Sequence, residues 1–492
     1  MAEGTFRFEE PPGGSPRQAQ KELAGAPLVV GTRRTVASAV EKPTALGRSA
    51  QDPGVEIRMA APPTLQDRRG GGPEGAVCLD TAVVPESRPR VIPSGRLSSL
   101  DAYRGFLMLV LVSGAYDSFG GGFGFERVAG HFSSNSVWHF LATQFTHVAW
   151  RGCSFWDLLM PAFVFIVGVA IPYSYAARRA RGYSDRLLTL HTLYRSAAFL
   201  LLGVVGLRIL ENLVLLRWPS RLDPNFVSIL PQLGLGYALV FCLVGKTWRV
   251  HVLAAVGLLA GYWLAFVRYP LPSPSFDYSV VGVPADFEHF TGFFAHWNKN
   301  SNMAAAFDRW FLNLLPRSTP FLFHANGVAT LNFIPTMATM IFGLMTGEYL
   351  RSPARSIEQF TRLIVAGFAG VGAGVLLDLT LCPVVKSLWT PSWVVYSTGW
   401  TLLIFAVFFW VIEVRGRRRW AFPLLVVGMN ALTAYCLANI ADYWIGAVWA
   451  KLLFAQGLFS GVYGPVWKSL ALMLSVWVVC LVLYRRRIFL RI

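Results

Sequence analysis

Charged residues are scarce in this chain. Asp, Glu, Lys and Arg make up 14% of its 492 residues, against about 25% in an ordinary soluble domain. Hydrophobic residues make up 54%, and the mean hydropathy is +0.47. Few charges and many long apolar runs argue against a soluble globular domain. They favour an integral membrane protein, with the lipid bilayer as its surroundings.

Acidic residues are the rarer of the charged kinds, with 27 Asp and Glu against 44 Lys and Arg, a formal net charge of +17. In a soluble protein this excess would suggest a nucleic acid partner. Here the basic residues form short clusters between apolar runs, which is typical of cytoplasmic loops of membrane proteins. We therefore expect no nucleic acid partner.

Cysteine is also infrequent. The six cysteines form no CxxC pair, and most lie within or beside apolar runs, where cysteine behaves as a small hydrophobic residue. This pattern predicts neither a disulfide framework nor a metal site. The six are Cys78, Cys153, Cys242, Cys382, Cys436 and Cys480.

Residues 1–95 lack a periodic apolar face, and no apolar core of a signal peptide follows the first residues. They are rich in Gly, Pro, Arg, Glu and Ser, a composition typical of disorder. We expect either a disordered cytoplasmic tail or a start codon assigned too early, with Met59 as an internal alternative. Residues 96–492 are then the membrane domain.

Ten apolar runs are long enough, or nearly so, to cross a membrane as helices, which takes about 20 residues. They predict an all-α, polytopic helical bundle with about ten transmembrane helices. A further run, 443–460, is either an interfacial helix or an eleventh span. The ten runs are 99–118, 154–176, 188–208, 227–245, 250–267, 326–347, 360–382, 392–413, 421–440 and 466–484.

The basic clusters follow every second run, which predicts a multi-pass protein with both termini in the cytoplasm. The first span then runs outward and the second returns, so His147 lies at the outer end of the second span. Residues 119–146 resemble a re-entrant or surface helix, and the long segment 268–325 is expected to fold over the outer face.

His147 stands just ahead of the second span, with Trp150, Arg151 and Asp157 close by in sequence. Ionisable groups at the edge of lipid are costly to desolvate, so they are functional candidates. Histidine is the side chain best suited to proton transfer near neutral pH. The alternative is that His147 only anchors the membrane interface, as aromatic residues do.

Asp157 follows His147 by ten residues, which is about 15 Å of rise along a helix. The two side chains can therefore meet only if the chain turns near Gly152. Otherwise Asp157 is expected to pair with a cation such as Arg104 or Arg195.

Further polar residues near the spans each allow more than one interpretation. Cys153 and His147 could form a nucleophile pair, although on a helix they would lie nearly two turns apart. Asp101 and Arg104 are three residues apart and can pair on one helix face. Arg104 could instead meet a phosphate group, since a guanidinium fork suits phosphate.

Several segments together resemble one family of multispanning acyltransferases. Residues 96–108 resemble an "SLDxxRGxxM" opening, and residues 147–168 contain HxxWxG followed by DLxxPxFxFxxG. Residues 332–347, 386–393 and 428–432 are similar to later landmarks of the same family. The ordered set, over about residues 96–490, resembles the heparan-α-glucosaminide N-acetyltransferase family and its bacterial DUF5009-type relatives.

The resemblance implies a bacterial inner-membrane enzyme that takes an acetyl group from cytosolic acetyl-CoA. The acceptor it implies is an extracytoplasmic amino sugar or glycan. The family's key histidine falls on His147, which serves either as a base or as a transient acetyl carrier. The resemblance also suggests a homodimer as a possibility.

These considerations define a set of candidate site residues. His147 and Asp157 are expected to be catalytic, and Arg104, Asp101 and Arg178 to hold acetyl-CoA. Members of the family often carry an asparagine late in the first span and an acidic turn before the sixth. In this chain Ser113 and Asp117 stand nearest the place of that asparagine, and Asn326 stands nearest the place of the acidic turn. The residues expected to face the acceptor are Trp150, Ser113, Asp117, Asn326 and Lys386.

Lys386 and Asp378 also bracket the outer end of the seventh span, where salt bridges are the alternative to acceptor contact. Two other function classes remain open. A proton-coupled transporter or flippase of a glycan-related small molecule would use His147 and Asp157 as a proton relay. Internal repeats would favour a transporter, and no convincing repeat is present. A purely structural membrane subunit is disfavoured by the polar cluster around His147.

Overall fold

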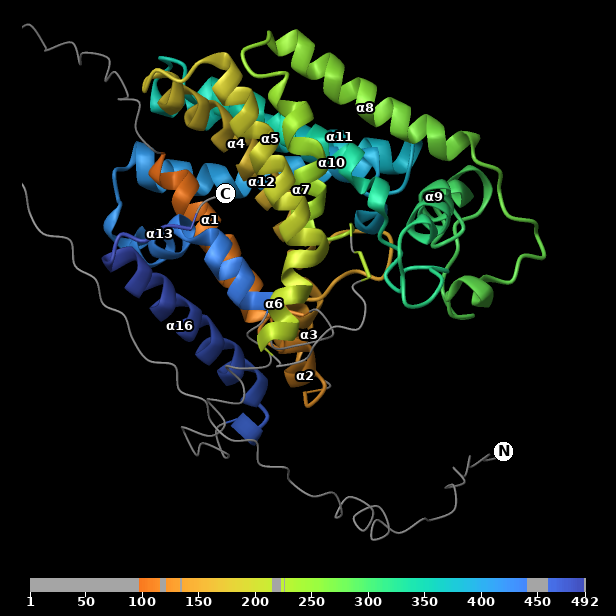
Figure 1. Ribbon diagram of the computed structural model, residues 1–492. Coiled ribbons are helices and arrows are strands. Elements are labelled where there is room, and N and C mark those ends of the chain that lie inside the picture. The colour runs from red at the N-terminus through yellow and green to blue at the C-terminus, as the bar shows by residue number, and fades with distance from the viewer. Residues whose placement is uncertain are drawn as a thin grey trace, which may run out of the picture. The chain divides into compact units, whose positions relative to one another are not determined.

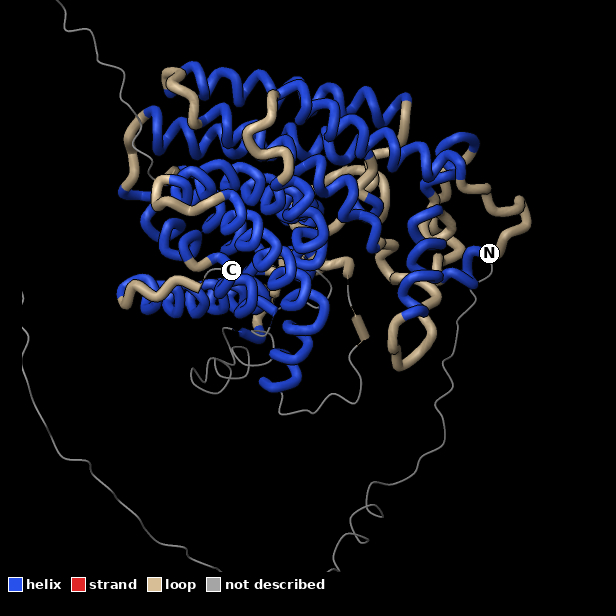
Figure 2. The backbone as a smooth tube through the Cα atoms, turned by 45° about the horizontal axis from the view of Figure 1, so that its top comes forward, coloured by secondary structure: helices blue, strands red, loops and turns tan. Residues whose placement is uncertain are grey.

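The computed structural model describes residues 97–115, 121–132, 135–214, 223–224, 226–439 and 459–490. All of them belong to one compact unit, Pro85–Ile492. The regular structure of these residues is helical (Figure 2). Within the described residues, the β-type pairing consists of one isolated bridge between Arg151 and Val385. The all-α prediction is confirmed. The predicted tail, Asp117 and most of 443–460 lie outside the described residues.

Each of the ten predicted spans coincides with a helix. Among the described residues, six helices are long and apolar enough to cross a membrane, and a seventh span results if Arg419–Met429 and Ala431–Asn439, bent by 66°, are counted as one. The prediction of about ten spans is therefore not confirmed. The helices α1 and α7 are shorter than a typical span, and α10 is also not among the candidate spans. The long helices are α1 (Ser98–Ser113), α4 (Leu159–Arg179), α5 (Asp185–Leu201), α7 (Ile229–Phe241), α8 (Trp248–Arg268), α10 (Phe333–Leu350), α11 (Ser356–Thr380), α12 (Pro391–Phe409) and α16 (Gly464–Arg485).

Shorter helices complete this part of the chain. A π-helical segment, Leu202–Gly206, joins α5 to α6 (Leu207–Val214), and another, Trp410–Val414, extends α12. The helix α13 (Phe422–Met429) ends at Asn430. The surface helices are α2 (Phe125–Ala129), α3 (Ser136–Gln144) and α9 (Met303–Phe311).

Local sequence signals explain several helix boundaries. Thr390 caps α12 by accepting a hydrogen bond from Trp393 N, and Pro391 follows at the first helical position. Ser184 caps α5 in the same way, and Asn302 caps α9. The helix α10 begins at Phe333, later than the predicted 326, because Ala325–Thr330 lies in an irregular turn before the short 3-10 helix Thr330–Asn332.

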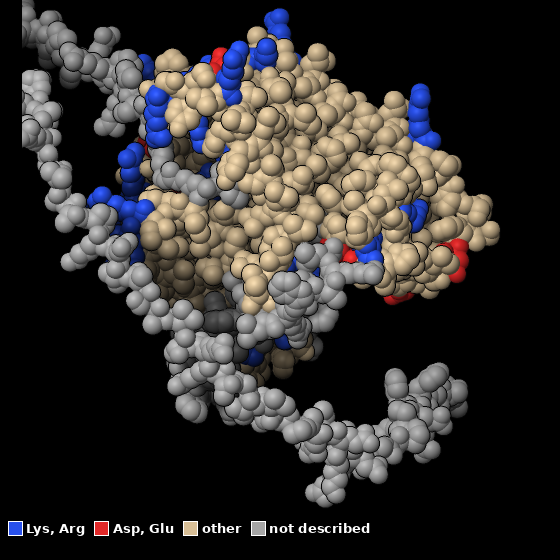
Figure 3. Space-filling view, viewed as in Figure 1, with Lys and Arg blue, Asp and Glu red and all other residues tan. Residues whose placement is uncertain are grey.

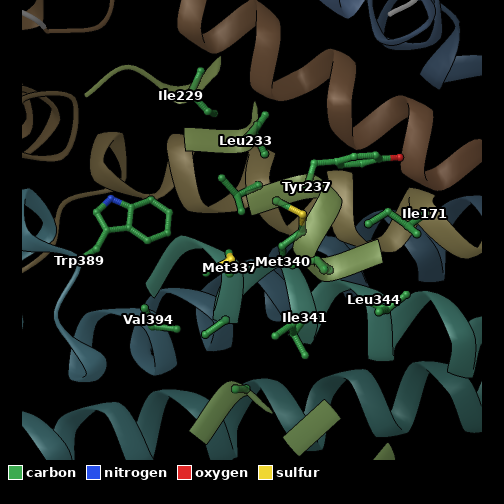
Figure 4. Close-up of a cluster of buried hydrophobic side chains, with 14 of the residues drawn as sticks. Ile171, Ile229, Leu233, Tyr237, Met337, Met340, Ile341, Leu344, Trp389 and Val394 are labelled. Carbon is green, nitrogen blue, oxygen red and sulfur yellow. The ribbon is translucent and has the colours of Figure 1, made fainter. Parts of the chain in front are cut away.

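Close glycine contacts hold the long helices together. A Cβ added to Gly168 of α4 would lie 2.2 Å from Met340 O of α10, and one on Gly343 of α10 would lie 2.2 Å from Phe165 O of α4. Gly374 of α11 packs in the same way on Tyr396 of α12. Small residues at such positions allow helix backbones to approach closely. A buried apolar cluster from α4, α7, α10 and α12 fills the space between these helices (Figure 4).

The described helices have two distinct ends. At one end, the loops that carry the basic clusters meet: Ser99 N donates to Glu413, Arg351 donates to Pro172 O, and Gly245 N donates to Glu348. We call this the basic end. Figure 3 shows a broad face with few charged side chains between basic residues on one side and mixed charges on the other, as a membrane protein requires.

The segment 269–332 folds over the opposite end, around α9 and beyond the end of α8 (Figure 1). We call this end the cap end. Tyr262 of α8 donates to Leu388 O, and the amide of Asn332 donates to Ser387 O. The cap therefore packs on the loop between α11 and α12. The helix α4 runs from the cap end to the basic end, so His147 and Arg178 lie at opposite ends of it.

One prediction concerns the crossing of α1 and α13. A Cβ on Gly105 would lie 1.8 Å from Leu424 O, closer than any real contact. Gly105→Ala should therefore push the two helices apart and lower the free energy of unfolding by about 1–3 kcal/mol, seen as a lower Tm in detergent. Gly257→Ala on α8 is the matched control, because nothing lies within 4 Å of that position. Equal Tm values for the two variants would contradict the tight crossing.

Candidate active site

A sharp turn at Gly152 brings His147 and Asp157 together. Gly152 has φ +116°, which favours glycine, and its N–H donates to Val384 O over 3.0 Å. The chain reverses there, and His147 Nδ1 lies 2.6 Å from Asp157 Oδ1. Contact was predicted only for a chain that turns near Gly152, and the structure has that turn. The alternative pairing of Asp157 with Arg104 or Arg195 is wrong.

The Asp157 carboxylate sits at the start of the second span with its side chain fully buried. Its Oδ2 accepts hydrogen bonds from Val148 N (3.3 Å), Ser154 N (3.1 Å) and Ser154 Oγ (3.0 Å). A buried carboxylate is tolerated when donors surround it in this way. The short 3-10 helix Trp156–Leu158 before α4 points the carboxylate back at the loop that carries His147.

Lys386 supplies the cation that pairs with Asp157, and its side chain is partly buried. Its Nζ donates to Asp157 Oδ1 over 3.0 Å and lies 2.8 Å from His147 Nδ1 and 3.4 Å from His147 Nε2. Burial lowers the pKa of Lys386, and the nearby carboxylate acts in the opposite direction. Lys386 was expected either to contact the acceptor or to form a salt bridge, and it forms a salt bridge. We call His147, Asp157 and Lys386 the triad.

Two loops distant in sequence carry the triad, and a second ion pair joins them. Arg151 forms the isolated bridge with Val385, and its guanidinium donates twice to Asp378, over 3.2 and 2.8 Å. Asp378 also accepts from Val384 N over 2.6 Å. The pair raises the pKa of Arg151, chiefly through its hydrogen bond to Asp378. Lys386 is thereby held next to a histidine that is more than two hundred residues away.

The imidazole of His147 is open on one side, with 44% of the side chain exposed. When Nδ1–H donates to Asp157, the lone pair lies on Nε2. The ring centroid of Trp156 lies 6.5 Å from that of His147 and forms one wall. The arrangement presents a nucleophilic, basic nitrogen oriented by a carboxylate, which is the geometry of a general base or a covalent carrier.

Cys153 does not form a nucleophile pair with His147. Its Sγ contacts Ser154 O instead, and burial raises the pKa of the thiol to about 12. The thiol is therefore protonated at neutral pH, whereas nucleophilic cysteines have a lowered pKa.

The residues expected to face the acceptor are dispersed. Trp150 is buried, its Nε1 donates to Trp297 O over 3.0 Å, and its ring packs under Gly327. As placed, it fastens the cap and has no open face for stacking on a sugar, which corrects its expected role. Asn326 is exposed in the turn that also contains Gly327. Ser113 is buried at the end of α1 and donates to Val110 O, while Asp117 lies outside the described residues.

The three residues expected to hold acetyl-CoA share one pocket at the basic end. Asp101, Arg104 and Arg178 line a cavity of about 430 Å³ between α1, α4, α5, α7 and the bent pair around Asn430. Arg104 donates to Asp101 over 3.1 Å, and Arg178 bonds Ser174 and His191. Arg179, Lys246 and Arg351 are not among the lining residues.

Two further arginines line the pocket, and neither was predicted to bind acetyl-CoA. Arg181 follows Arg178 at the mouth. Arg195 lies within an apolar span, donates to Tyr237 Oη over 2.7 Å and stacks on that ring and on Phe199. A guanidinium inside an apolar run is itself a signal of a ligand site. The pocket thus has four guanidinium groups and one carboxylate.

The pocket and the triad share one helix. Along α4 the lining runs from Arg178 inward to Phe163, about 22 Å of helical rise, and Asp157 lies about 9 Å further. The lining therefore covers more than half of this span and ends six residues from Asp157 along the chain. Among the residues that the structure describes, no group of three or more His, Cys, Asp and Glu could hold a metal ion.

Together these features define a multi-pass helical membrane protein with a triad at its cap end and a basic pocket at the other. No family model matches the chain. It is 24% identical over 463 residues to the human protein heparan-alpha-glucosaminide N-acetyltransferase and 24% identical over 470 residues to the mouse protein of that name. Each match covers 86% of this chain and 64% of the relative, so the chain spans less than two thirds of their length.

These two matches support the resemblance to the heparan-alpha-glucosaminide N-acetyltransferase-like family that the ordered motifs predicted. The assignment to the bacterial DUF5009 type stays a prediction.

Proposed function

We propose that this protein is a transmembrane N-acetyltransferase that uses acetyl-CoA from the basic end and acetylates an amino sugar or glycan at the cap end. The observation that carries the proposal is the placement of the basic pocket and the triad along the same helix, α4. The printed names of the relatives support the same chemistry.

The pocket suits a long ligand with an anionic head. The four guanidinium groups at Arg104, Arg178, Arg181 and Arg195 would bind the phosphates of coenzyme A, for which arginine forks are well suited. Further in, the wall is apolar, with Phe163, Val167 and Ala170 on α4. A thin acyl-pantetheine arm can follow this wall toward the triad, which brings the thioester close to His147.

His147 Nε2 can act in either of two ways. As a base, it takes a proton from the acceptor amine while the amine nitrogen attacks the thioester carbonyl and coenzyme A leaves as the thiolate. As a carrier, Nε2 attacks the carbonyl first, releases coenzyme A and passes the acetyl group to the amine. In both routes Asp157 holds the ring and stabilises the positive charge that develops on it.

We place the basic end in the cytoplasm, since clusters of Lys and Arg are retained there. The triad then faces the extracytoplasmic side of an inner membrane, with both ends of the chain inside. This orientation lets a cytosolic donor serve an acceptor across the bilayer without movement of either molecule through it.

Sealed vesicles test the proposal. Labelled acetyl-CoA is added on the basic-end side, with glucosamine trapped on the cap-end side. We expect labelled N-acetylglucosamine to appear inside intact vesicles. A proton-coupled transporter would instead move glucosamine without labelling it, and that result would replace the proposal.

Arg195→Gln tests the pocket. Loss of one charge-assisted hydrogen bond to a phosphate is worth about 1.5–3 kcal/mol, so KM for acetyl-CoA should rise about 10- to 100-fold while kcat stays within about twofold. Arg179→Gln is the matched control, because Arg179 is exposed and pairs with Asp185 outside the pocket. An unchanged KM for acetyl-CoA in Arg195→Gln would show that acetyl-CoA does not bind in this pocket.

A further inference from the structure

The proposed acetyl transfer does not by itself require a lysine beside His147 and Asp157, yet Lys386 contacts both. It comes from the loop between α11 and α12, and its side chain is 18% exposed. We propose that Lys386 is a positioning residue that keeps His147 neutral by opposing the charge that Asp157 induces on the ring. This inference rests on the proposed function and assigns a further residue to the same site.

The three polar atoms form a tight triangle. His147 Nδ1 and Asp157 Oδ1 are 2.6 Å apart, Lys386 Nζ and that oxygen are 3.0 Å apart, and Lys386 Nζ and Nδ1 are 2.8 Å apart. An ammonium group only donates, so it cannot share a hydrogen bond with an Nδ1–H. With Nδ1–H directed at the carboxylate, Lys386 donates to Asp157 and leaves a positive charge beside the ring.

That charge decides which form of His147 is stable. A carboxylate next to a histidine favours the imidazolium, and a cation next to it disfavours the imidazolium. An imidazolium lacks the Nε2 lone pair that a base or a nucleophile needs. With Lys386 present, protonating the ring would place two cations at one carboxylate oxygen.

The other polar groups near the ring, in the part of the chain that the structure describes, do not alter this balance. Burial keeps the Cys153 thiol protonated and neutral. Arg151 and Asp378 neutralise each other through two hydrogen bonds. The Trp156 ring carries no charge. Asp157 and Lys386 are therefore the opposing charges that act on His147.

A variant without the ammonium group should still fold. In Lys386→Met, Asp157 keeps its bonds from Val148 N, Ser154 N, Ser154 Oγ and His147 Nδ1. The methionine side chain fills a similar volume. The loops remain joined by Arg151 and Asp378.

Diethyl pyrocarbonate provides a test that does not depend on acetyl transfer, because it acylates the neutral form of a histidine ring and not the imidazolium. The rate of modification at His147 is followed against pH by peptide mass spectrometry in the full-length, detergent-solubilised protein. In Lys386→Met the midpoint should move to higher pH, because the Asp157 carboxylate then acts on the ring without an opposing cation. Lys386→Arg should keep the wild-type midpoint. The exposed His139 on α3 is the internal control and should show one midpoint in all variants.

Kinetics give a second measurement. In Lys386→Met the acidic limb of the kcat profile should move upward with the modification midpoint, with KM for the amine unchanged. An unmoved or lowered midpoint would overturn the inference and leave Lys386 a plain salt-bridge partner. A raised KM at an unchanged midpoint would overturn it in favour of acceptor contact. Absence of acetyl transfer in the wild type would reject the proposed function. The rate of His147 modification would still test the role of Lys386 in that case.

Discussion

Replacement of His147 by alanine is expected to reduce acetyl transfer by about 10²- to 10⁴-fold, the usual contribution of a positioned base. The imidazole is the one group at the cap end that combines an open nitrogen with an orienting carboxylate in the described structure. Transfer of label from acetyl-CoA to glucosamine in membranes measures the effect. KM for acetyl-CoA should change little, since the pocket lining lies elsewhere along α4.

His139→Ala is the matched control for this loss. His139 is exposed on α3, close in sequence to the site, and has no contact with the triad among the described hydrogen bonds. Its activity should equal that of the wild type. Activity of His147→Ala within tenfold of the wild type would refute a chemical role for the ring and leave it as an interface anchor.

The same variant separates the two mechanisms. If His147 carries the acetyl group, the wild type should release coenzyme A in a burst without acceptor, in an amount equal to the enzyme present. A base alone gives no burst, because transfer then requires the amine. His147→Ala should show no burst under either mechanism.

Asp157→Asn is expected to lower kcat by about 10²- to 10⁴-fold, as loss of the carboxylate of a catalytic triad does elsewhere. The change retains the shape but removes the charge that holds Nδ1–H and balances Lys386. His147 can then adopt the wrong tautomer, and a buried ammonium group loses its counter-ion. Single-turnover rates and Tm, measured together, separate the chemical loss from the structural one.

Asp378→Asn is the comparison for Asp157→Asn. It weakens the pair with Arg151 that joins the two loops but leaves the three charges of the triad in place. We expect less than about a tenfold loss of activity, since an ion pair that is 43% exposed on its Arg151 side contributes little. Equal losses in the two variants would show that loop geometry, and not the carboxylate beside the ring, determines the rate.

The pattern of residues alone predicted the helices and drew attention to His147. Apolar runs of about 20 residues have few alternatives to helix in a membrane, so each predicted run contains a helix. His147 stood out because an ionisable group beside such a run is costly. The number of complete spans was not predictable in the same way, because α1, α7 and the bent pair at Asn430 are shorter or broken within apolar sequence.

The sequence predicted individual residues of the pocket but not that they line a common cavity. Asp101, Arg104 and Arg178 were each assigned to the donor, and they do line one cavity. Arg195 was considered only as an alternative partner for Asp157, because a buried charge is normally paired. It stacks on Tyr237 and faces the cavity. Which helix faces which cavity depends on packing between helices, and no local pattern encodes it.

By itself, the order of residues determined that this is a helical membrane protein, that its basic clusters gather at one end, and that His147 stands at the edge of a span. These follow from the cost of placing charge and unpaired backbone groups in lipid. Only the tertiary structure decided that Asp157 meets His147 and that Lys386, 229 residues beyond Asp157, joins them. The first required the reversal at Gly152, and the second required the Arg151–Val385 bridge between two loops, so both depend on contacts between segments that spacing along the chain does not reveal.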